Sequence, residues 1–226
     1  MPSLTVENYV KIIYLLSADK PGVEAVATGE LAQALDVSPG TVTGMLKTLS
    51  QADLSTYTPY EGARLTPSGQ RLALSVLRRH RLVELFLAQT LSMPWDEVHE
   101  EAENIEHAVS ERLVDRIDIF LGRPAVDPHG DPIPGADGSL TEPGGQPLAS
   151  LDRGQRFRLI RVVDQDPSFL RYLTECGLDL GTEGTLEENR PEAGAVTLRV
   201  GERSVALGTA AAGKVLVTSP TRTKGT

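Results

Sequence analysis

The sequence has a single cysteine and no long hydrophobic run. One cysteine cannot form an intramolecular disulfide, which favours a reducing cytosol. The longest apolar runs, such as IIYLL at residues 12–16, are far shorter than a membrane span, so we expect no membrane partner. The N-terminus lacks the basic start and the small-residue cleavage site of a signal peptide. We therefore expect a cytoplasmic protein.

Cationic side chains are also scarce. The chain has 22 basic and 31 acidic residues, and its net charge is −9. An acidic protein repels nucleic acid at long range, which argues against a constitutive DNA-binding protein but leaves open one that a cation switches. The remaining composition, with 40% apolar and 23% charged residues, is that of an ordinary globular protein. It excludes a wholly disordered, collagen-like or coiled-coil chain.

Residues 1–63 are predicted to form short helices followed by a hairpin. Apolar residues at helical spacing predict an amphipathic helix over residues 5–17. Two more helices are predicted within TGELAQALDVSPGTVTGMLKTLSQADL. The break between them falls at DVSP, where Ser38 is a good N-cap and Pro39 suits the first helical position. A weakly alternating segment around Glu61 and Gly62 predicts the hairpin. In this order, these are the parts of a winged helix-turn-helix.

The second helix of such a motif fits the major groove, and its N-terminal residues reach base edges. Small and hydroxylic residues at that end, with two cations, are the predicted DNA-binding residues: Ser38, Pro39, Gly40, Thr41, Thr43, Lys47 and Arg64. The alternative is any helical hairpin with a capped second helix. Residues 1–63 hold three Lys and no Arg against seven acids, which predicts weak nonspecific affinity for phosphate.

Beyond residue 63 the composition changes twice. Residues 64–121 predict one long helix and a second that starts near Pro94 and continues to about Leu121; both need further partners to bury their apolar faces. Residues 122–150, with six Gly and six Pro, predict a linker or an ordered extended loop. Residues 151–226 predict a small β-rich domain with one short helix, because RFRLIRVV, AVTLRV, SVALG and KVLVTS resemble strands separated by glycine turns.

All four histidines lie close to carboxylates. His80 and Glu84 are four residues apart, as are Glu103 and His107, so each pair shares a helix face. The segment DEVHEEAENIE (96–106) has six acids and no Lys or Arg, and a divalent cation would relieve the like-charge repulsion. Imidazole and carboxylate ligands without thiolate suit Mn²⁺, Fe²⁺ or Zn²⁺. The alternative is a solvated acidic helix face.

These features together resemble one family over nearly the whole chain. The winged motif, RRHRLVE, VHEEAENIEHAVSERLVDRI, DPHGDPIPG and the β domain follow one another as in the diphtheria-toxin-repressor family of iron- and manganese-dependent transcriptional regulators. The resemblance implies a mainly α fold with a small β domain. It implies a winged helix-turn-helix at 1–63, a helical dimerisation and metal-binding domain at 64–121, a linker at 122–150, and an SH3-like domain at 151–226.

The resemblance also implies two metal sites per subunit. The first would use Asn8, Glu103, Glu106 and His107. The second would use His80, Glu84 and His99, completed by Asp164 or Asp166 from the β domain; Asp127 and His129 of DPHG are alternative ligands. A carboxylate at Glu103, where iron-responsive members carry a thiolate, favours Mn²⁺ over Fe²⁺. Lys11 stands where one manganese subgroup has a further Glu, which argues against its closely spaced pair of metals.

The predicted function is therefore that of a metal-dependent repressor, not an enzyme. Loaded with Mn²⁺ or Fe²⁺, a homodimer would bind palindromic operator DNA and control metal homeostasis genes, with no small-molecule substrate. One alternative is a metal-independent winged-helix regulator that senses a small molecule or a partner. A di-metal carboxylate enzyme would need two Glu-x-x-His motifs, and Glu106 stands where the histidine should be.

Overall fold

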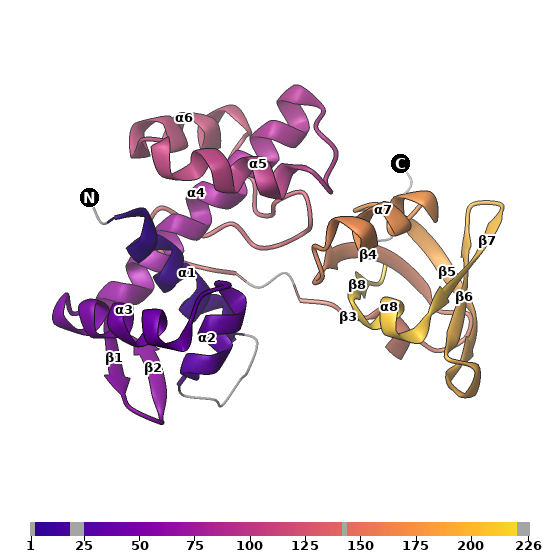
Figure 1. The fold of residues 1–226 in the computed structure, drawn as a ribbon. Coiled ribbons are helices and arrows are strands. Elements are labelled where there is room, and N and C mark those ends of the chain that lie inside the picture. Colours follow the sequence, from indigo (N-terminus) through magenta and orange to yellow (C-terminus); the bar gives the residue numbers. More distant parts are fainter. Residues whose placement is uncertain (1–2, 19–24, 142–143, 221–226) are drawn as a thin grey trace. The chain divides into compact units, whose positions relative to one another are not determined.

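The computed structural model describes residues 3–18, 25–141 and 144–220, and they fall into two compact units (Figure 1). The first unit consists of Met1–His80, Glu106–Glu111 and Pro134–Ser139. The second consists of Arg81–Ile105, Arg112–Ile133 and Leu140–Thr226. The helix α4 (Pro67–Leu91) is continuous and contributes to both. No helix in the described part of the chain has both the length and the apolar character needed to cross a membrane.

The first unit contains the predicted winged helix-turn-helix. Its elements are α1 (Leu4–Ala18), α2 (Thr28–Ala34), α3 (Pro39–Gln51), β1 (Ser55–Thr58), β2 (Gly62–Leu65), the first part of α4, and the 3₁₀ turn η1 (Glu106–Ala108). Strands β1 and β2 pair antiparallel as the wing, after the end of α3 (Figure 1). One apolar cluster joins Tyr9, Val10 and Ile13 of α1 to Val42, Leu46 and Leu49 of α3. A movement of α1 is therefore transmitted to α3 by packing.

The turn between α2 and α3 follows from its sequence. Asp36 has a φ of +50°, in the left-handed region that Asp tolerates better than most residues. The Oγ of Ser38 accepts a hydrogen bond from the backbone N–H of Thr41 at 3.1 Å, and Pro39 opens α3. The predicted N-cap and first helical position are therefore confirmed.

The second predicted long helix is wrong. Instead of one helix from Pro94 to Leu121, the chain forms α5 (Val98–Ile105), the turn η1, and α6 (Glu111–Phe120). Both residues next to the break contact α1, because Glu106 pairs with Lys11 and His107 pairs with Glu7. Adjacent residues of a straight α-helix point about 100° apart, so a break in the helix helps both to face inward.

The part of residues 122–150 that the structure describes includes an ordered, buried stretch. Asp127, His129 and Asp131 are buried, and Val126 and Pro132 form an isolated bridge. Gly130 has a φ of +87°, and a Cβ there would lie 2.1 Å from the carbonyl oxygen of Ile160. The backbone of this loop thus packs directly against the β part of the second unit.

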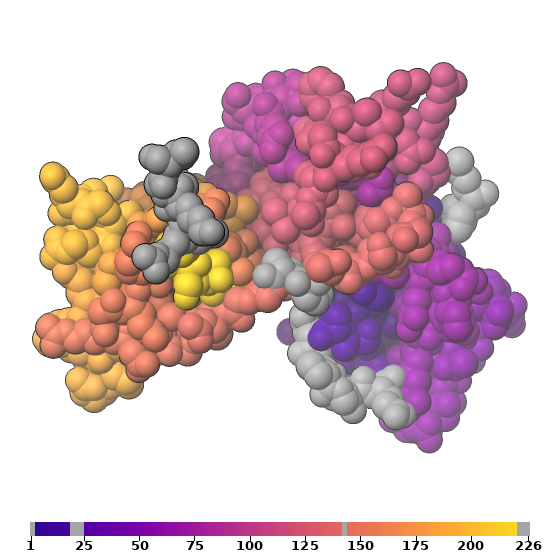
Figure 2. All heavy atoms as spheres, turned by 180° about the vertical axis from the view of Figure 1, so that it is seen from behind, coloured from indigo at the N-terminus to yellow at the C-terminus, as the bar shows by residue number. Residues whose placement is uncertain are grey.

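The β part is a six-stranded antiparallel sheet in the order β3-β8-β4-β5-β6-β7. Its elements are β3 (Gln146–Pro147), η2 (Leu148–Ser150), β4 (Arg156–Val162), α7 (Pro167–Glu175), β5 (Glu183–Arg190), η3 (Pro191–Ala193), β6 (Ala195–Val200), β7 (Arg203–Gly208), α8 (Thr209–Gly213) and β8 (Val215–Thr218). A buried apolar cluster around Phe157 lies in its interior. The surface atoms of the β part, coloured orange to yellow, lie together in Figure 2. The four predicted strands and the helix are confirmed. The predictions missed β5, because EGTLEENR is mostly polar.

Candidate metal centres

Glu106 is the centre of a polar cluster in the first unit. The carboxylate is fully buried. Its Oε1 accepts a hydrogen bond from Nζ of Lys11 at 2.8 Å, and its Oε2 lies 2.8 Å from Nδ1 of His80. Burial would raise the pKa of Glu106, but the hydrogen bond and charge of His80 and the ammonium of Lys11 outweigh it and hold the pKa below its usual value. The carboxylate is therefore charged at neutral pH.

His107 presents one ring nitrogen to a carboxylate and leaves the other for a ligand. Its Nδ1 lies 2.8 Å from Oε2 of Glu7. Its Nε2 is buried and lies 3.2 Å from Oε1 of Glu106, without the alignment of a hydrogen bond. Neighbouring donor atoms on one metal ion, with bonds of about 2.0–2.2 Å, are about 3 Å apart. The spacing of these two atoms suits two ligands of one ion.

Two polar residues of α1 contact this cluster: Glu7, which sequence reasoning missed, and Lys11, which it considered only as an argument against a closely spaced pair of metals. Glu7 and Lys11 are buried and four residues apart, so they share a helix face. They lie on the face of α1 opposite the apolar residues that pack on α3, so the hydrophobic pattern does not select them. Asn8, the predicted ligand beside Glu7, has a buried Oδ1 with no hydrogen-bond partner. Glu103, three residues before Glu106, lies in the last turn of α5.

A second cluster, wholly within the second unit, joins Glu84 of α4 to the loop residues Asp127 and His129. The three side chains are buried, and one ligand atom from each lies within 4.8 Å of the others. Burial first, and then the charges of Glu84 and Asp131, raise the pKa of Asp127 well above its usual value, although Arg81 opposes them. Such crowding of buried carboxylates is what a dication would relieve.

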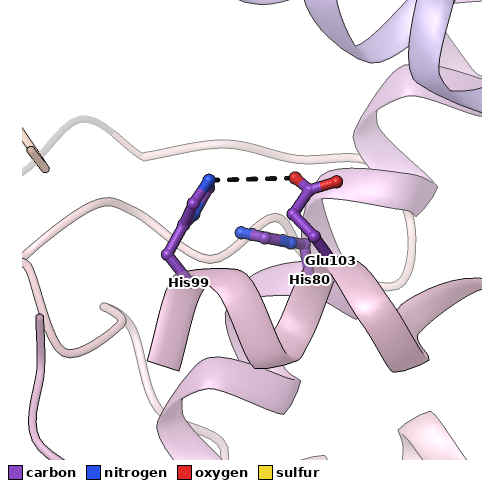
Figure 3. A group of neighbouring side chains, drawn as sticks. All are labelled: His80, His99 and Glu103. Carbon is purple, nitrogen blue, oxygen red and sulfur yellow. Dashed lines mark ion pairs between the residues drawn. The ribbon is translucent and has the colours of Figure 1, made fainter. Parts of the chain in front are cut away.

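His99 of α5 extends this second cluster. Its Nδ1 lies 3.1 Å from Oε1 of Glu84, and its Nε2 lies 3.9 Å from Oε1 of Glu103, the dashed pair in Figure 3. Figure 3 also shows His80 on α4, whose Nδ1 is the atom near Glu106. Of the residues predicted for the second site, the structure thus brings Glu84 to His99 and to the alternative ligands Asp127 and His129.

The two aspartates proposed from the β domain have other contacts. Asp164 accepts a hydrogen bond from Nζ of Lys214, which lowers its pKa, and another from the backbone N–H of Asp166. Asp166 caps α7 by accepting from the backbone N–H groups of Ser168 and Phe169. Neither belongs to the group around Glu84, so a ligand role for Asp164 stays a prediction.

Buried ligand atoms without a hydrogen bond support a metal ion in both clusters. Among the described residues, buried side-chain atoms without a hydrogen bond include Asn8 Oδ1, His107 Nε2, Asp127 Oδ2 and His129 Nδ1. These are four of nine such atoms among the described residues, and all four belong to predicted ligands; such atoms are costly unless something binds them. The other ring nitrogen of His129, Nε2, lies 2.7 Å from the carbonyl oxygen of Trp95. A metal-binding histidine is normally held in this way through its second nitrogen.

Trp95 offers a direct test of the second cluster, since it is the chain's only tryptophan. Its ring stacks on that of His129 with centroids 6.2 Å apart. We expect Mn²⁺, which is paramagnetic, to quench Trp95 fluorescence when bound by His129, and His129→Ala to abolish the saturable quenching. As a control, Thr174→Val removes the hydrogen bond of the indole N–H and should leave the quenching intact. Equal quenching in His129→Ala would place the ion elsewhere.

The predicted DNA-binding residues lie on the surface of the winged motif. Ser38, Pro39, Gly40, Thr41, Lys47 and Arg64 are exposed, and Thr43 is half-buried. The hydroxyl of Thr43 donates to the carbonyl oxygen of Pro39 at 3.0 Å. The N-terminus of α3 therefore presents a smooth surface of small side chains.

Three protein-family models match the chain. Residues 1–63 match the iron dependent repressor N-terminal DNA binding domain, and residues 66–135 match the iron dependent repressor metal binding and dimerisation domain. Residues 146–219 match the FeoA domain. With the six-stranded antiparallel sheet, these matches confirm the predicted fold class.

Relatives and solved structures agree with this assignment. The iron-dependent repressor IdeR of Mycobacterium tuberculosis is 34% identical over 173 residues, which are 76% of this chain and 72% of the relative. The regulator MntR of Lysinibacillus sphaericus is 36% identical over 52% of this chain and 81% of its own length. A manganese-dependent transcriptional repressor in complex with manganese superposes with a TM-score of 0.83 at 38% identity, covering 95% of this chain and all of that one. The repressor ScaR with bound Zn²⁺ superposes with a TM-score of 0.76 at 32% identity, covering 97% of this chain and all of that one.

Proposed function

Since the chain belongs to the diphtheria-toxin-repressor family of metal-dependent transcriptional repressors, we propose that Mn²⁺ or Fe²⁺ held by the two clusters drives its homodimer onto operator DNA. The observation that carries the assignment of the clusters is the set of buried ligand atoms that have no hydrogen bond. The family consists of repressors, which leaves no support for the enzyme alternative. A repressor acts on the chromosome, so a cytoplasmic location is part of the proposal.

We assign the first site to Glu106 and His107, with Asn8 and Glu103 as the predicted further ligands. The second is assigned to Glu84, Asp127, His129 and His99, with His80 and Asp164 as predicted additions. All these donors are oxygen or imidazole nitrogen, a set that favours Mn²⁺ and accepts Fe²⁺. Lys11 supports a single ion in the first site, because its ammonium beside Glu106 adds a positive charge that would repel a second dication.

The mechanism follows from where Glu106 and His107 lie. Glu106 and Nε2 of His107 would hold a dication, which would supply positive charge opposite the buried carboxylate. Around it, Lys11 and Glu7 tie α1 to η1 through Glu106 and His107. The opposite face of α1 packs on α3, so holding α1 also fixes the recognition helix. Moving such a switch from mostly off to mostly on requires about 5 kcal/mol of preferential binding.

The second unit carries apolar surface for the homodimer. Leu113, Ile119 and Phe120 of α6 are at least half exposed, and Phe120 meets Phe86 of α4 edge to face. Exposed apolar patches of this kind mark protein interfaces. A symmetric dimer would place two α3 helices about 34–36 Å apart and match a palindromic operator. We propose metal uptake and storage genes as the targets.

Fluorescence anisotropy on upstream DNA tests the function. Metal-stripped protein is titrated with Mn²⁺, then with Fe²⁺ without oxygen, and a chelator is added at the end. We expect tight binding only with metal and complete reversal by the chelator. Tight binding without metal would contradict the proposal and leave a metal-independent regulator.

Lys47 is one of the two cations among the predicted DNA-binding residues. It is exposed one turn beyond the small residues of α3. We expect Lys47→Gln to weaken binding to operator and to unrelated duplex alike, and to reduce the slope of log affinity against log salt by about 1, since one phosphate is no longer neutralised. Anisotropy between 50 and about 200 mM salt measures it. Weaker binding to one sequence alone would instead indicate that Lys47 reads a base.

A further inference from the structure

Glu7 is a buried carboxylate beside the first site, although it is not one of the proposed metal ligands. Its side chain is 9% exposed, and its Oε2 lies 2.8 Å from Nδ1 of His107 and 3.1 Å from Nη1 of Arg79. Arg79 also donates to Oε1 of Glu111 at 2.8 Å. The carboxylate of Glu7 is therefore held in place by Arg79 of α4 and contacts the imidazole of His107.

The contact with Glu7 decides which nitrogen of His107 carries the proton. A neutral imidazole has one N–H donor and one lone-pair acceptor. A carboxylate accepts only, so Nδ1 must donate to Glu7, and the lone pair is left on Nε2. In the other tautomer the Nε2–H would point toward Oε1 of Glu106, 3.2 Å away, and no lone pair would be available there.

We propose that Glu7 is a positioning residue of the metal centre. It selects the Nδ1–H tautomer of His107, so that Nε2 faces the ion with its lone pair. It also couples the ion to DNA binding, since the hydrogen bond that orients His107 comes from α1. The idea rests on the proposed function for the identity of the ligand, but the tautomer itself does not depend on metal.

A purely structural ion pair between Glu7 and Arg79 is the competing explanation. A glutamine at position 7 can replace Glu7 as a hydrogen-bond acceptor for His107, but it cannot replace Glu7 as the charged partner of Arg79. Glu7→Gln keeps an oxygen acceptor for the Nδ1–H but removes the charge that pairs with Arg79. Glu7→Leu removes both the acceptor and the charge. Glu111→Gln is the matched control, because it removes charge from the same arginine without contacting His107.

The first test is ¹⁵N NMR of the histidine rings in metal-free protein at pH 8, with His107 assigned by its absence in His107→Ala. We expect protonated Nδ1 in the wild type, Glu7→Gln and Glu111→Gln, and a shift toward protonated Nε2 in Glu7→Leu. A wild-type ring protonated on Nε2, or a glutamine variant that behaves as leucine does, would overturn the proposal. The glutamine variant decides the matter even where Glu7→Leu fails to fold.

The second test is Mn²⁺ affinity by competition with a chelating dye. We expect a decrease of about 10–100-fold in Glu7→Leu, the range for residues that orient a metal ligand, and near wild-type affinity in Glu7→Gln and Glu111→Gln. In a His107→Ala background, Glu7→Leu should cause no further decrease. Equal affinity of wild type and Glu7→Leu would refute the positioning role and leave the proposed function standing. A wild-type protein that binds no Mn²⁺ would refute the function, whatever the tautomer.

Discussion

Glu106→Ala is expected to weaken metal-dependent operator binding by at least about 100-fold, because it removes the carboxylate that joins α1 to α4 and that we propose as a ligand of the ion. The wild-type carboxylate is fully buried and contacts both Lys11 and His80. Removing one partner of a buried ion pair destabilises a protein by about 3–5 kcal/mol, so the melting temperature should fall as well. Operator anisotropy with Mn²⁺ and thermal unfolding measure the two effects.

The matched control for Glu106 is Glu101, an exposed glutamate of the same acidic segment. Glu101→Ala should bind operator at the wild-type Mn²⁺ threshold and unfold at the wild-type temperature. If the two variants behave alike, the acidic segment acts only by its total charge. An unchanged Mn²⁺ threshold in folded Glu106→Ala would remove Glu106 from the switch.

Asp127→Asn is expected to stabilise the metal-free protein at neutral pH while removing much of the stabilisation by Mn²⁺. The pKa of Asp127 in the fold is raised by burial and by its neighbours Glu84 and Asp131, against Arg81. Its contribution to stability is therefore fully present below the ordinary carboxyl pKa and is lost as pH rises through the raised value. Asparagine can keep the Oδ1 that accepts from the backbone N–H groups of His129 and Asp131. The asparagine side chain does not ionise, so this pH-dependent destabilisation should be absent.

Thermal unfolding in chelator at several pH values measures this effect. We expect Asp127→Asn to melt several degrees above wild type at pH 7.5, since each kcal/mol is about 2–4 °C for a chain of this size, and the gap to close toward pH 4. Asp137→Asn is the control of opposite sign, because its bond with Ser139 lowers the pKa of Asp137. A lower melting temperature for Asp127→Asn in chelator would contradict the account.

Local sequence patterns predicted the helices and strands that are determined by residues close together in the chain. Ser38 and Pro39 start α3 through contacts within four residues, and the alternation in β4 and β6 to β8 is visible in the chain itself. The predictions failed where distant contacts decide. The break at Glu106 and His107 depends on Lys11, Glu7 and His80, and the pairs that α1 contributes join residues 95 and 100 positions apart.

A ligand role for the residues of both clusters stays a prediction. The resemblance pointed to Glu106, His107 and Glu84, and the loop ligands Asp127 and His129 followed from DPHG. The resemblance gave no reason to consider Glu7, which contacts no predicted ligand except His107 in the described contacts. Only the fold places this carboxylate beside the histidine.

The coupling between metal and DNA is tested most directly by its reciprocity. If Mn²⁺ raises operator affinity by some factor, operator must raise Mn²⁺ affinity by the same factor. Mn²⁺ affinity is measured by dye competition with and without a saturating duplex from the upstream region. The account predicts that operator tightens Mn²⁺ binding by at least about 100-fold in the wild type, and not in Glu106→Ala. Mn²⁺ affinity that is the same with and without operator would contradict it.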